Sequence, residues 1–310
     1  MKKLLSLLLA TICFVAVAQP VNTPKKIITS FPVGSGPDVL ARKIAENLSE
    51  QWKHPVIVDN RPGANGTIAM DAYLAESAAP QSIYLAQNDN FISHPVLYNT
   101  QKYLQSMKLL SPVFKVDLVL IASPEVTDWQ SLVALSKQRV SFGSWGVGSG
   151  GHIAGLELAE HLGVPAVHVP YRDYSQWFID VSSKQLLYSF STLASTAKLE
   201  KAGKIKYIAF NSNKRDPDYP NVPTLRELTG KTIGSQQWIG FYIHADTPNS
   251  ITNKLHRDIQ TVIKSAAIQE TFDSLNYRMW LATPSEFEKQ IYTDRETFLR
   301  AYNRFNITVK

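Results

Sequence analysis

The chain has 310 residues, a formal net charge of +6 at pH 7 and one cysteine, Cys13. This length is sufficient for two domains of ordinary size, each with its own core. The positive charge is mild, and its densest runs, at 198–206 and 214–215, are broken up by acidic or apolar residues. The composition therefore argues against a nucleic-acid-binding protein and suits long-range attraction of small anions.

The first residues have the pattern of a secretory signal peptide. Lys2 and Lys3 precede an apolar run that extends to Val17, and Ala16-Val17-Ala18 provides a small-x-small cleavage site. We expect a signal peptide at 1–18, cleavage after Ala18 and export to the periplasm. The run is shorter than the ~20 apolar residues that span a bilayer. Because Cys13 leaves with the signal, we expect no disulfide and no cysteine metal site.

Strands and helices alternate along most of the remaining chain, which is typical of an α/β protein with parallel sheets flanked by helices. In chain order, the pattern predicts strands at 26–31, 55–59, 82–86, 113–122, 140–143, 166–169, 186–189, 206–210 and 238–244, and helices at 37–51, 67–76, 129–136, 152–162, 174–182 and 192–202.

Two long β segments, at 113–122 and 238–244, bracket a compact α/β block. We interpret them as the two crossings between the lobes of a hinged protein. A proline-rich loop at 216–224 precedes the second segment, and the region from 247 to 298 is helical in character. The predicted organisation is lobe 1 at 19–120 plus 242–310 and lobe 2 at 121–241.

Two glycine-rich turns, at 34–38 and 146–152, each follow a predicted strand and open a predicted helix. Such a turn exposes backbone N–H groups at the positive end of the helix dipole, an arrangement that binds anions. Ligands of these sheets lie at the carboxyl ends of strands. The two turns therefore predict one anion held from two sides.

The second turn also matches the dinucleotide fingerprint G-x-G-x-x-G, with Asp173 after the next strand. An exported protein meets little free NAD, which counts against this interpretation. The seven histidines show neither H-x-x-x-H nor H-E-x-x-H spacing, and G-x-S-x-G is absent from the sequence. We therefore predict no metal, no cofactor and no catalytic residue, with a NAD-dependent or hydrolytic enzyme as the alternative.

The chain resembles the Bug-type substrate-binding receptors of tripartite tricarboxylate transporters, essentially from end to end. The resemblance is carried, in order, by KIITSFPVGSGPDVLARKIAENL, VIVDNRPGANGTIAMD, FGSWGVGSGGHIAGLELAEHLGV, VHVPYRD, AGKIKYIAFNSNKRDPDYPNVPTLRE and GFYIHADTP. It implies the two-lobed type II periplasmic binding protein fold, in which each lobe is a β-sheet flanked by helices and two crossover segments join the lobes. It also implies a non-enzymatic receptor that binds a small organic carboxylate and delivers it to membrane permease subunits. We expect a monomer.

The resemblance places the ligand loops on the two glycine-rich turns and adds flanking contacts. The implied ligand-binding residues are Phe31, Val33, Gly34, Ser35, Gly36 and Asp38 in lobe 1, Ser144, Trp145, Gly146, Gly148, Ser149, Gly150 and His152 in lobe 2, and Asn88, Asn90, Tyr171, Arg172, Asp173 and Ser191 around them.

Several of these residues have two interpretations. Asp38 either caps its helix or meets a ligand amine, and His152 either donates to an anion or packs at the helix start. Arg172 is either a cleft cation or a solvent-facing side chain. Trp145 and Tyr174 line an aromatic-carboxylate pocket or pack between helix and sheet.

Two departures from the family pattern affect the expected ligand. Pro37 removes one N–H group from the first turn, where Ser35 adds a hydroxyl. Asp173, if it faces the site, disfavours a bare polyanion and favours a ligand that carries a cation or hydroxyl groups. The expected mechanism is capture on the first turn, followed by rotation of the lobes and closure by the second turn.

Overall fold

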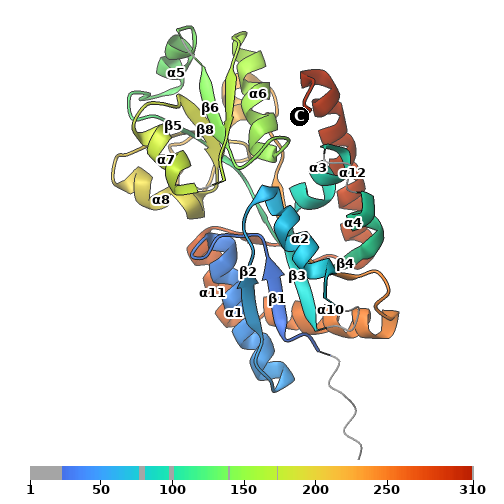
Figure 1. The fold of residues 1–310 in the computed structure, drawn as a ribbon. Coiled ribbons are helices and arrows are strands. Elements are labelled where there is room, and N and C mark those ends of the chain that lie inside the picture. The colour runs from blue at the N-terminus through green and yellow to red at the C-terminus, as the bar shows by residue number, and fades with distance from the viewer. Residues whose placement is uncertain (1–22, 77–80, 98–100, 139, 173, 309–310) are drawn as a thin grey trace, which may run out of the picture.

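The computed structural model describes residues 23–76, 81–97, 101–138, 140–172 and 174–308. Two lobes, each built on its own sheet, lie one above the other in Figure 1. The predicted signal peptide at 1–18 and Asp173 lie outside the described residues. Within the described ranges, the structure contains no helix whose length and apolar character would let it cross a bilayer.

Lobe 1 has, in the described part of the chain, a six-stranded sheet in the order β11-β4-β10-β3-β1-β2. Its strands are β1 (Lys26–Thr29), β2 (Ile57–Asn60), β3 (Ser82–Gln87), β4 (Met107–Val116), β10 (Gln237–His244) and β11 (Arg278–Met279). One face packs against α1 (Gly36–Trp52), α10 (Asn249–Ile263) and α11 (Ala266–Leu275). The other face is covered by η1 (Ala64–Gly66), α2 (Thr67–Leu74), α3 (Asn88–Leu97), α4 (Gln101–Ser106) and α12 (Pro284–Phe305).

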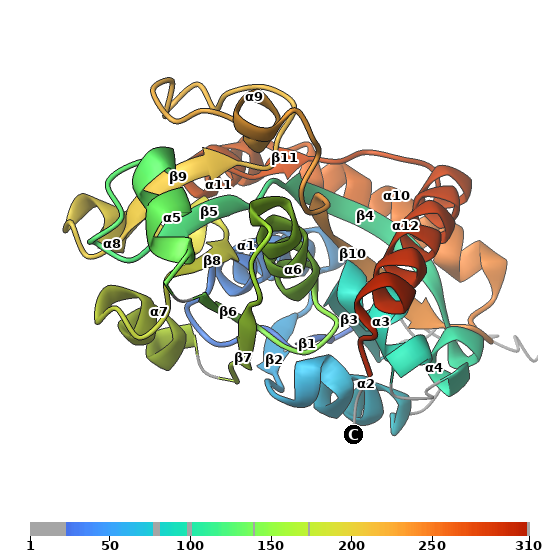
Figure 2. The same cartoon turned by 90° about the horizontal axis from the view of Figure 1, so that it is seen from above.

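Lobe 2 has a five-stranded sheet in the order β7-β6-β8-β5-β9 among the described residues. Its strands are β5 (Val119–Ala122), β6 (Ser141–Ser144), β7 (Val167–Pro170), β8 (Tyr188–Ser191) and β9 (Lys206–Phe210). The helices α5 (Trp129–Ser136), α6 (Gly150–Leu162) and α9 (Leu225–Thr229) pack on one face, and α7 (Tyr174–Ser182) and α8 (Leu193–Lys201) pack on the other. Figure 2 shows α6 and α8 on opposite sides of this sheet.

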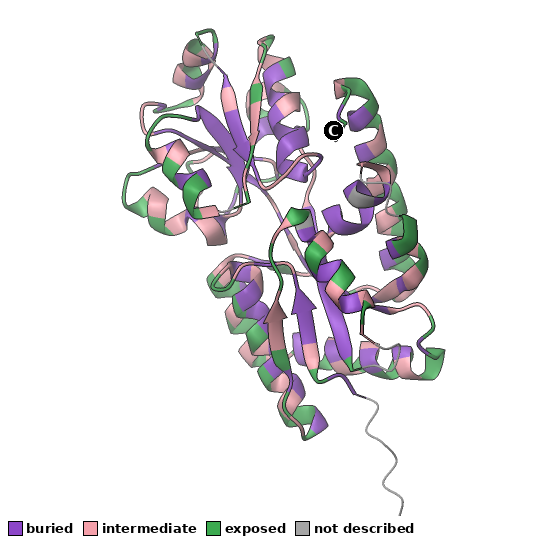
Figure 3. Ribbon diagram, viewed as in Figure 1, coloured by how far each residue is buried: buried purple, intermediate pink, exposed green. Residues whose placement is uncertain are grey.

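The central strands of both sheets are buried, as their purple colour in Figure 3 shows, whereas the edge strands β2 and β7 are partly exposed. Every residue of β5 and β8 is buried, and β3 and β10 are buried except at their last residues. Strands covered on both faces are apolar without alternation, which is why the runs in this sequence predicted strands well. The three-layer arrangement leaves the cleft between the lobes as the place where loops from both sheets meet.

The predicted single strand at 113–122 is wrong, because β4 and β5 belong to different sheets. The backbone leaves the ladder at Leu118, whose N–H donates to Asn211 Oδ1 at 2.7 Å and whose carbonyl accepts from Asn211 N at 2.9 Å. Asn211 thereby ties the first crossover to the segment that leads into the second. By strand pairing, β5 begins at Val119 and β10 at Gln237, a few residues before the expected lobe boundaries at 120 and 241.

The expectation of parallel sheets is also wrong, because both sheets are mixed. β1 pairs in parallel with β2 and β3, and β6 with β7 and β8, whereas β10 and β5 run antiparallel to their neighbours. β10 and β5 each follow a crossover from the other lobe, so each enters its sheet from the inter-lobe side instead of returning through a helix.

The helix α6 packs so closely on its sheet that Gly155 has no room for a side chain. A Cβ atom there would overlap the ring of Phe142, which is itself stacked on Tyr188 at a centroid distance of 5.5 Å. We expect Gly155→Ala to lower the free energy of unfolding by ~1–2 kcal/mol, because overpacking outweighs the gain of ~1 kcal/mol in helix propensity. Urea unfolding of both proteins measures the change. Equal or greater stability of the variant would show that the ring of Phe142 moves aside at little cost.

Candidate functional site

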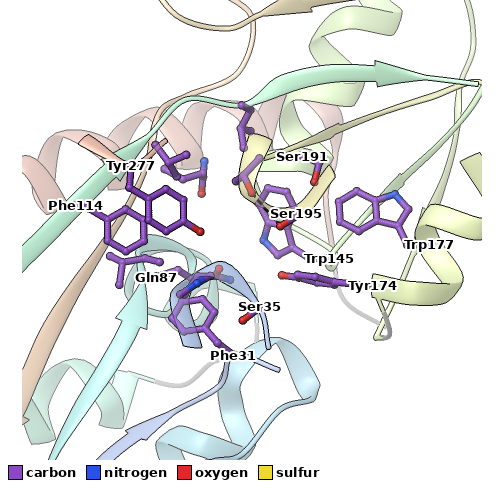
Figure 4. Close-up of a pocket in the computed structure, with 16 residues that line it drawn as sticks. Phe31, Ser35, Gln87, Phe114, Trp145, Tyr174, Trp177, Ser191, Ser195 and Tyr277 are labelled. Carbon is purple, nitrogen blue, oxygen red and sulfur yellow. Dashed lines mark hydrogen bonds between the residues drawn. The ribbon is translucent and has the colours of Figure 1, made fainter. Parts of the chain in front are cut away.

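A cleft between the lobes consists of two connected chambers. The inner chamber has a volume of about 60 Å³ and the outer chamber of about 540 Å³. Phe31, Gln87, Trp145 and Tyr174 line both chambers and so form the neck between them. Figure 4 shows the inner chamber, with side chains from both lobes converging on it.

The start of α1 in lobe 1 and the start of α8 in lobe 2 both lie at the inner chamber. Ser35, the N-cap residue of α1, and Thr192, the N-cap residue of α8, line the chamber, and neither side chain caps its own helix. Ser191 and Ser195 add hydroxyl groups on the side of lobe 2. Helix N-termini that lack side-chain caps leave backbone N–H groups available to an anion.

No charged side chain lines the inner chamber among the described residues. Six aromatic residues line it, namely Phe31, Phe114, Trp145, Tyr174, Trp177 and Tyr277. The outer chamber differs, because Arg172 lines it with an exposed side chain. An anion in the inner chamber would thus be held by neutral donors and helix dipoles.

The first glycine-rich turn is braced from within by Asp38. Its buried carboxylate accepts from Gly34 N at 2.8 Å and from Asn60 Nδ2 at 2.8 Å, and it forms an ion pair with Arg42 at 3.0 Å. Although burial raises the pKa of Asp38, these hydrogen bonds and the ion pair outweigh it and hold the pKa below its ordinary value. The side chain therefore shapes the turn from behind, and the structure does not bring it into the cleft.

The second glycine-rich turn meets a carboxylate that belongs to the protein itself. Asp89, in the first turn of α3 in lobe 1, accepts from Trp145 Nε1 at 2.6 Å and from Gly150 N at 3.4 Å, both in lobe 2. Gly150 is the first residue of α6, so Asp89 occupies the position where the sequence predicted the ligand's carboxylate. Burial raises the pKa of Asp89 to about 7, although its two donors favour the ionised form.

The rest of the second turn is held by further contacts with lobe 1. The Gly148 carbonyl accepts hydrogen bonds from Ser93 Oγ and from Tyr302 Oη, each at 2.8 Å. The Gly148 amide donates to His152 Nδ1 at 3.0 Å. With these groups engaged inside the protein, the turn offers no free cradle for a pyrophosphate, and the dinucleotide alternative receives no support.

His152 packs instead of donating to a ligand. Its ring stacks on His168 at a centroid distance of 3.7 Å, and His168 Nε2 lies 2.8 Å from Ser144 Oγ. Burial lowers the pKa of His152 to about 4; burial and the neighbouring ring lower that of His168 to about 3. Both rings are therefore neutral at pH 7 and form part of the wall behind the turn.

The structure divides the predicted ligand residues into two groups. Those that line a chamber are Phe31, Ser35, Trp145, Gly146, Tyr171, Arg172 and Ser191. Those that do not are Val33, which is exposed, Gly34, Gly36 and Asp38 of the first turn, Asn88 and Asn90 of α3, and Ser144, Gly148, Ser149, Gly150 and His152 of the second turn. Asp173 lies outside the described residues.

Sequence reasoning missed several residues of the inner chamber. Tyr277, Gln237 and Thr192 come from segments without a glycine-rich turn, and Tyr277 follows the left-handed C-cap Asn276 of α11. Pairing of β10 between β3 and β4 brings Gln237 to the chamber. No local pattern marks any of these residues. Among the described residues, no group of three or more His, Cys, Asp or Glu side chains could hold a metal ion.

The buried charge of Asp89 leads to a pH-dependent prediction for Asp89→Asn. In the wild type, folding raises the pKa of Asp89 from 3.8 to about 7, so its ionisation destabilises the folded state as the pH rises between these values. We expect the variant to match the wild type near pH 4 and to gain stability relative to it by ~1.4 kcal/mol per pH unit up to pH 7. Denaturant unfolding of both proteins across this pH range measures the difference in their free energies of unfolding. The histidine contributions cancel in this difference because both proteins contain the same histidines. A difference independent of pH would contradict the buried charge.

Comparison with known proteins agrees with this two-lobed arrangement. A family model described as "Tripartite tricarboxylate transporter family receptor" matches residues 40–297. Protein BugT of Bordetella pertussis is 26% identical over 304 residues, which cover 92% of this chain and 92% of BugT. The periplasmic binding protein BugD has a similar fold, with a TM-score of 0.83 at 24% identity over 93% of this chain and 99% of BugD. An R. palustris protein solved with adipate has a TM-score of 0.85 at 20% identity over 92% of this chain and 98% of its own. Because the family model spans well over half of the sequence, the chain belongs to the receptor family of the tripartite tricarboxylate transporters.

Proposed function

We propose that this protein is a periplasmic receptor that binds a small organic carboxylate between its lobes and delivers it to the permease subunits of a tripartite transporter. The observation that carries the proposal is the inner chamber. Two helix N-termini, one from each lobe, face a chamber that has no charged side chain among its described lining residues. This arrangement attracts one negative charge and needs no cation to hold it.

The magnitudes are sufficient for a receptor. Each helix N-terminus contributes ~0.3–1 kcal/mol to anion binding, or up to ~2 kcal/mol when partly buried. Hydrogen bonds to a charged group contribute ~1.5–3 kcal/mol each. Four or five such contacts, less the entropy lost on binding, leave room for the ~8 kcal/mol of a micromolar complex.

The R. palustris relative solved with adipate supports a carboxylate as the class of ligand. The family description, which names a transporter receptor, supports delivery to a membrane partner. In the proposed mechanism, the open lobes admit the ligand through the outer chamber, and rotation about the crossover segments brings α1 and α8 together around its carboxylate. The hydrogen bonds between Asn211 and Leu118 join the two crossover segments about which the lobes would rotate.

A binding screen of the chain from residue 19 onward tests the proposal. The protein is unfolded and refolded to remove bound ligand, and its melting temperature is then measured with mono-, di- and tricarboxylates, acidic amino acids and NAD. At about one hundred times its dissociation constant, a true ligand stabilises the fold by ~2.7 kcal/mol. Trp145 and Trp177 line the chamber, so their fluorescence gives a second signal. Stabilisation by NAD but by no acid would overturn the proposal.

Placing a negative charge at the start of α1 should abolish acid binding. Ser35→Asp puts a carboxylate at the N-cap, where it stabilises the helix but repels an anion in the chamber. We expect at least a hundredfold loss of affinity by calorimetry, with an unchanged or higher melting temperature. Thr283→Asp is the matched control, because Thr283 is the exposed N-cap residue of α12 and lines neither chamber. Wild-type affinity in Ser35→Asp would place the carboxylate elsewhere.

A further inference from the structure

Two tyrosine hydroxyl groups from opposite lobes point into the inner chamber. Tyr277 comes from lobe 1 and Tyr174 from the first residue of α7 in lobe 2, and Figure 4 shows their hydroxyl ends directed toward each other across the chamber. Tyr277 is 5% exposed. Neither hydroxyl has a hydrogen-bond partner among the described residues. Both oxygens open onto the chamber, so each can donate a hydrogen bond to a polar group that binds there.

Both rings are fixed, so the hydroxyl positions are set before a ligand arrives. The Tyr277 ring stacks on Phe114 at a centroid distance of 4.1 Å, and the Tyr174 ring meets Trp177 edge-on at 5.6 Å. Tyr277 Oη lies against Gly36 in the first turn of α1, where a Cβ atom would overlap it. Burial raises the pKa of both phenols, so both keep their protons and can donate at neutral pH.

The surroundings of these two donors suit one ligand carboxylate and oppose a second. Asp89 accepts a hydrogen bond from Trp145, a residue of the neck, and its negative charge adds to burial in raising the pKa of Tyr174. The exposed Arg172 of the outer chamber is a weak partner because solvent screens it. A second carboxylate at the neck would meet the like charge of Asp89 and would find no cation among the described residues that line the neck.

The volumes of the two chambers indicate which part of the ligand each chamber can hold. The inner chamber, at about 60 Å³, is less than half the size of a cavity of ~150 Å³ that binds benzene. It therefore takes a carboxylate group, while the body of the ligand lies at the neck. Phe31 and Trp145 line the neck and present aromatic surface to that body. Aromatic surface of this kind favours a flat apolar ring.

We propose that the ligand is an aromatic monocarboxylate whose single carboxylate is held between the hydroxyl groups of Tyr174 and Tyr277. This inference rests on the proposed function and specifies its ligand class. The two tyrosines determine specificity, since they set both the number of charges that the inner chamber accepts and where the carboxylate lies.

Calorimetry with matched acids tests the ligand class. Benzoate and terephthalate share one ring and differ by one carboxylate, and adipate carries two carboxylates on a flexible chain. We expect benzoate to bind at least tenfold more tightly than terephthalate or adipate. Tighter binding of either dicarboxylate would overturn this inference and leave the proposed function standing. Binding of no acid in the wider carboxylate panel would overturn both.

Tyr277→Phe and Tyr174→Phe test the two donors, since each keeps its ring packing and loses only the hydroxyl. We expect about a tenfold loss of benzoate affinity for each variant and about a hundredfold loss for the double variant. The melting temperature without ligand should not fall. Tyr207→Phe is the control, because its hydroxyl bonds Thr196 in the same lobe and Tyr207 lines neither chamber. Affinities within twofold of wild type in the double variant would overturn the assignment.

Discussion

The contact between Asp89 and the start of α6 is the constraint on which the arrangement of this cleft depends. A carboxylate from lobe 1 caps a helix of lobe 2 and also accepts from the indole of Trp145, a residue of the neck. The contact therefore fixes the position of one wall of the cleft relative to the other lobe. It also fills the helix terminus that would otherwise attract the ligand, because a helix N-terminus binds a protein carboxylate as readily as a foreign one.

Because Asp89 occupies the start of α6, the helix starts left to attract an anion at the inner chamber are those of α1 and α8. The helices α1 and α8 start at the inner chamber with N-cap side chains that do not cap them. A neutral chamber of this kind avoids the burial of a lysine or arginine, whose uncompensated charge would be costly whenever the ligand is absent. When the ligand is absent, neutral donors such as the two phenols cost less free energy than a buried charge.

The sequence predicted the fold more completely than the site, and the difference has a physical reason. Fully covered strands such as β5 and β8 are apolar throughout, and α1 carries its apolar residues on one face, so local patterns reveal them. The break at Leu118 depends on hydrogen bonds with Asn211, which is 93 residues away in the chain, and no local pattern records it. The alternation of strands and helices also predicted parallel pairing for β5 and β10, the two strands that follow the crossovers and run antiparallel to their neighbours.

At the candidate site, Ser35 of the first glycine-rich turn lines the inner chamber, whereas in the second turn Gly150 N donates to the protein's own Asp89. Glycine spacing shows that N–H groups are exposed at a helix start, but it does not show which carboxylate reaches them. Asp89 is 61 residues from Gly150, and Tyr277 is far from both turns in sequence. Pairings of this kind arise only from the way in which the lobes pack.

The division of the site between the lobes also explains how a tight receptor can release its ligand. Tyr277 and the start of α1 belong to lobe 1, whereas Tyr174 and the start of α8 belong to lobe 2. Each lobe alone offers about half of the neutral donors. Because the binding free energies contributed by the two lobes add, one lobe alone supplies about half of the total. Halving ~8 kcal/mol therefore weakens a micromolar site to about the millimolar range. The described residues that line the inner chamber include no cation that could hold the carboxylate by itself. In the proposed mechanism, opening of the lobes, which also separates Asp89 from Trp145 and Gly150, therefore releases the ligand.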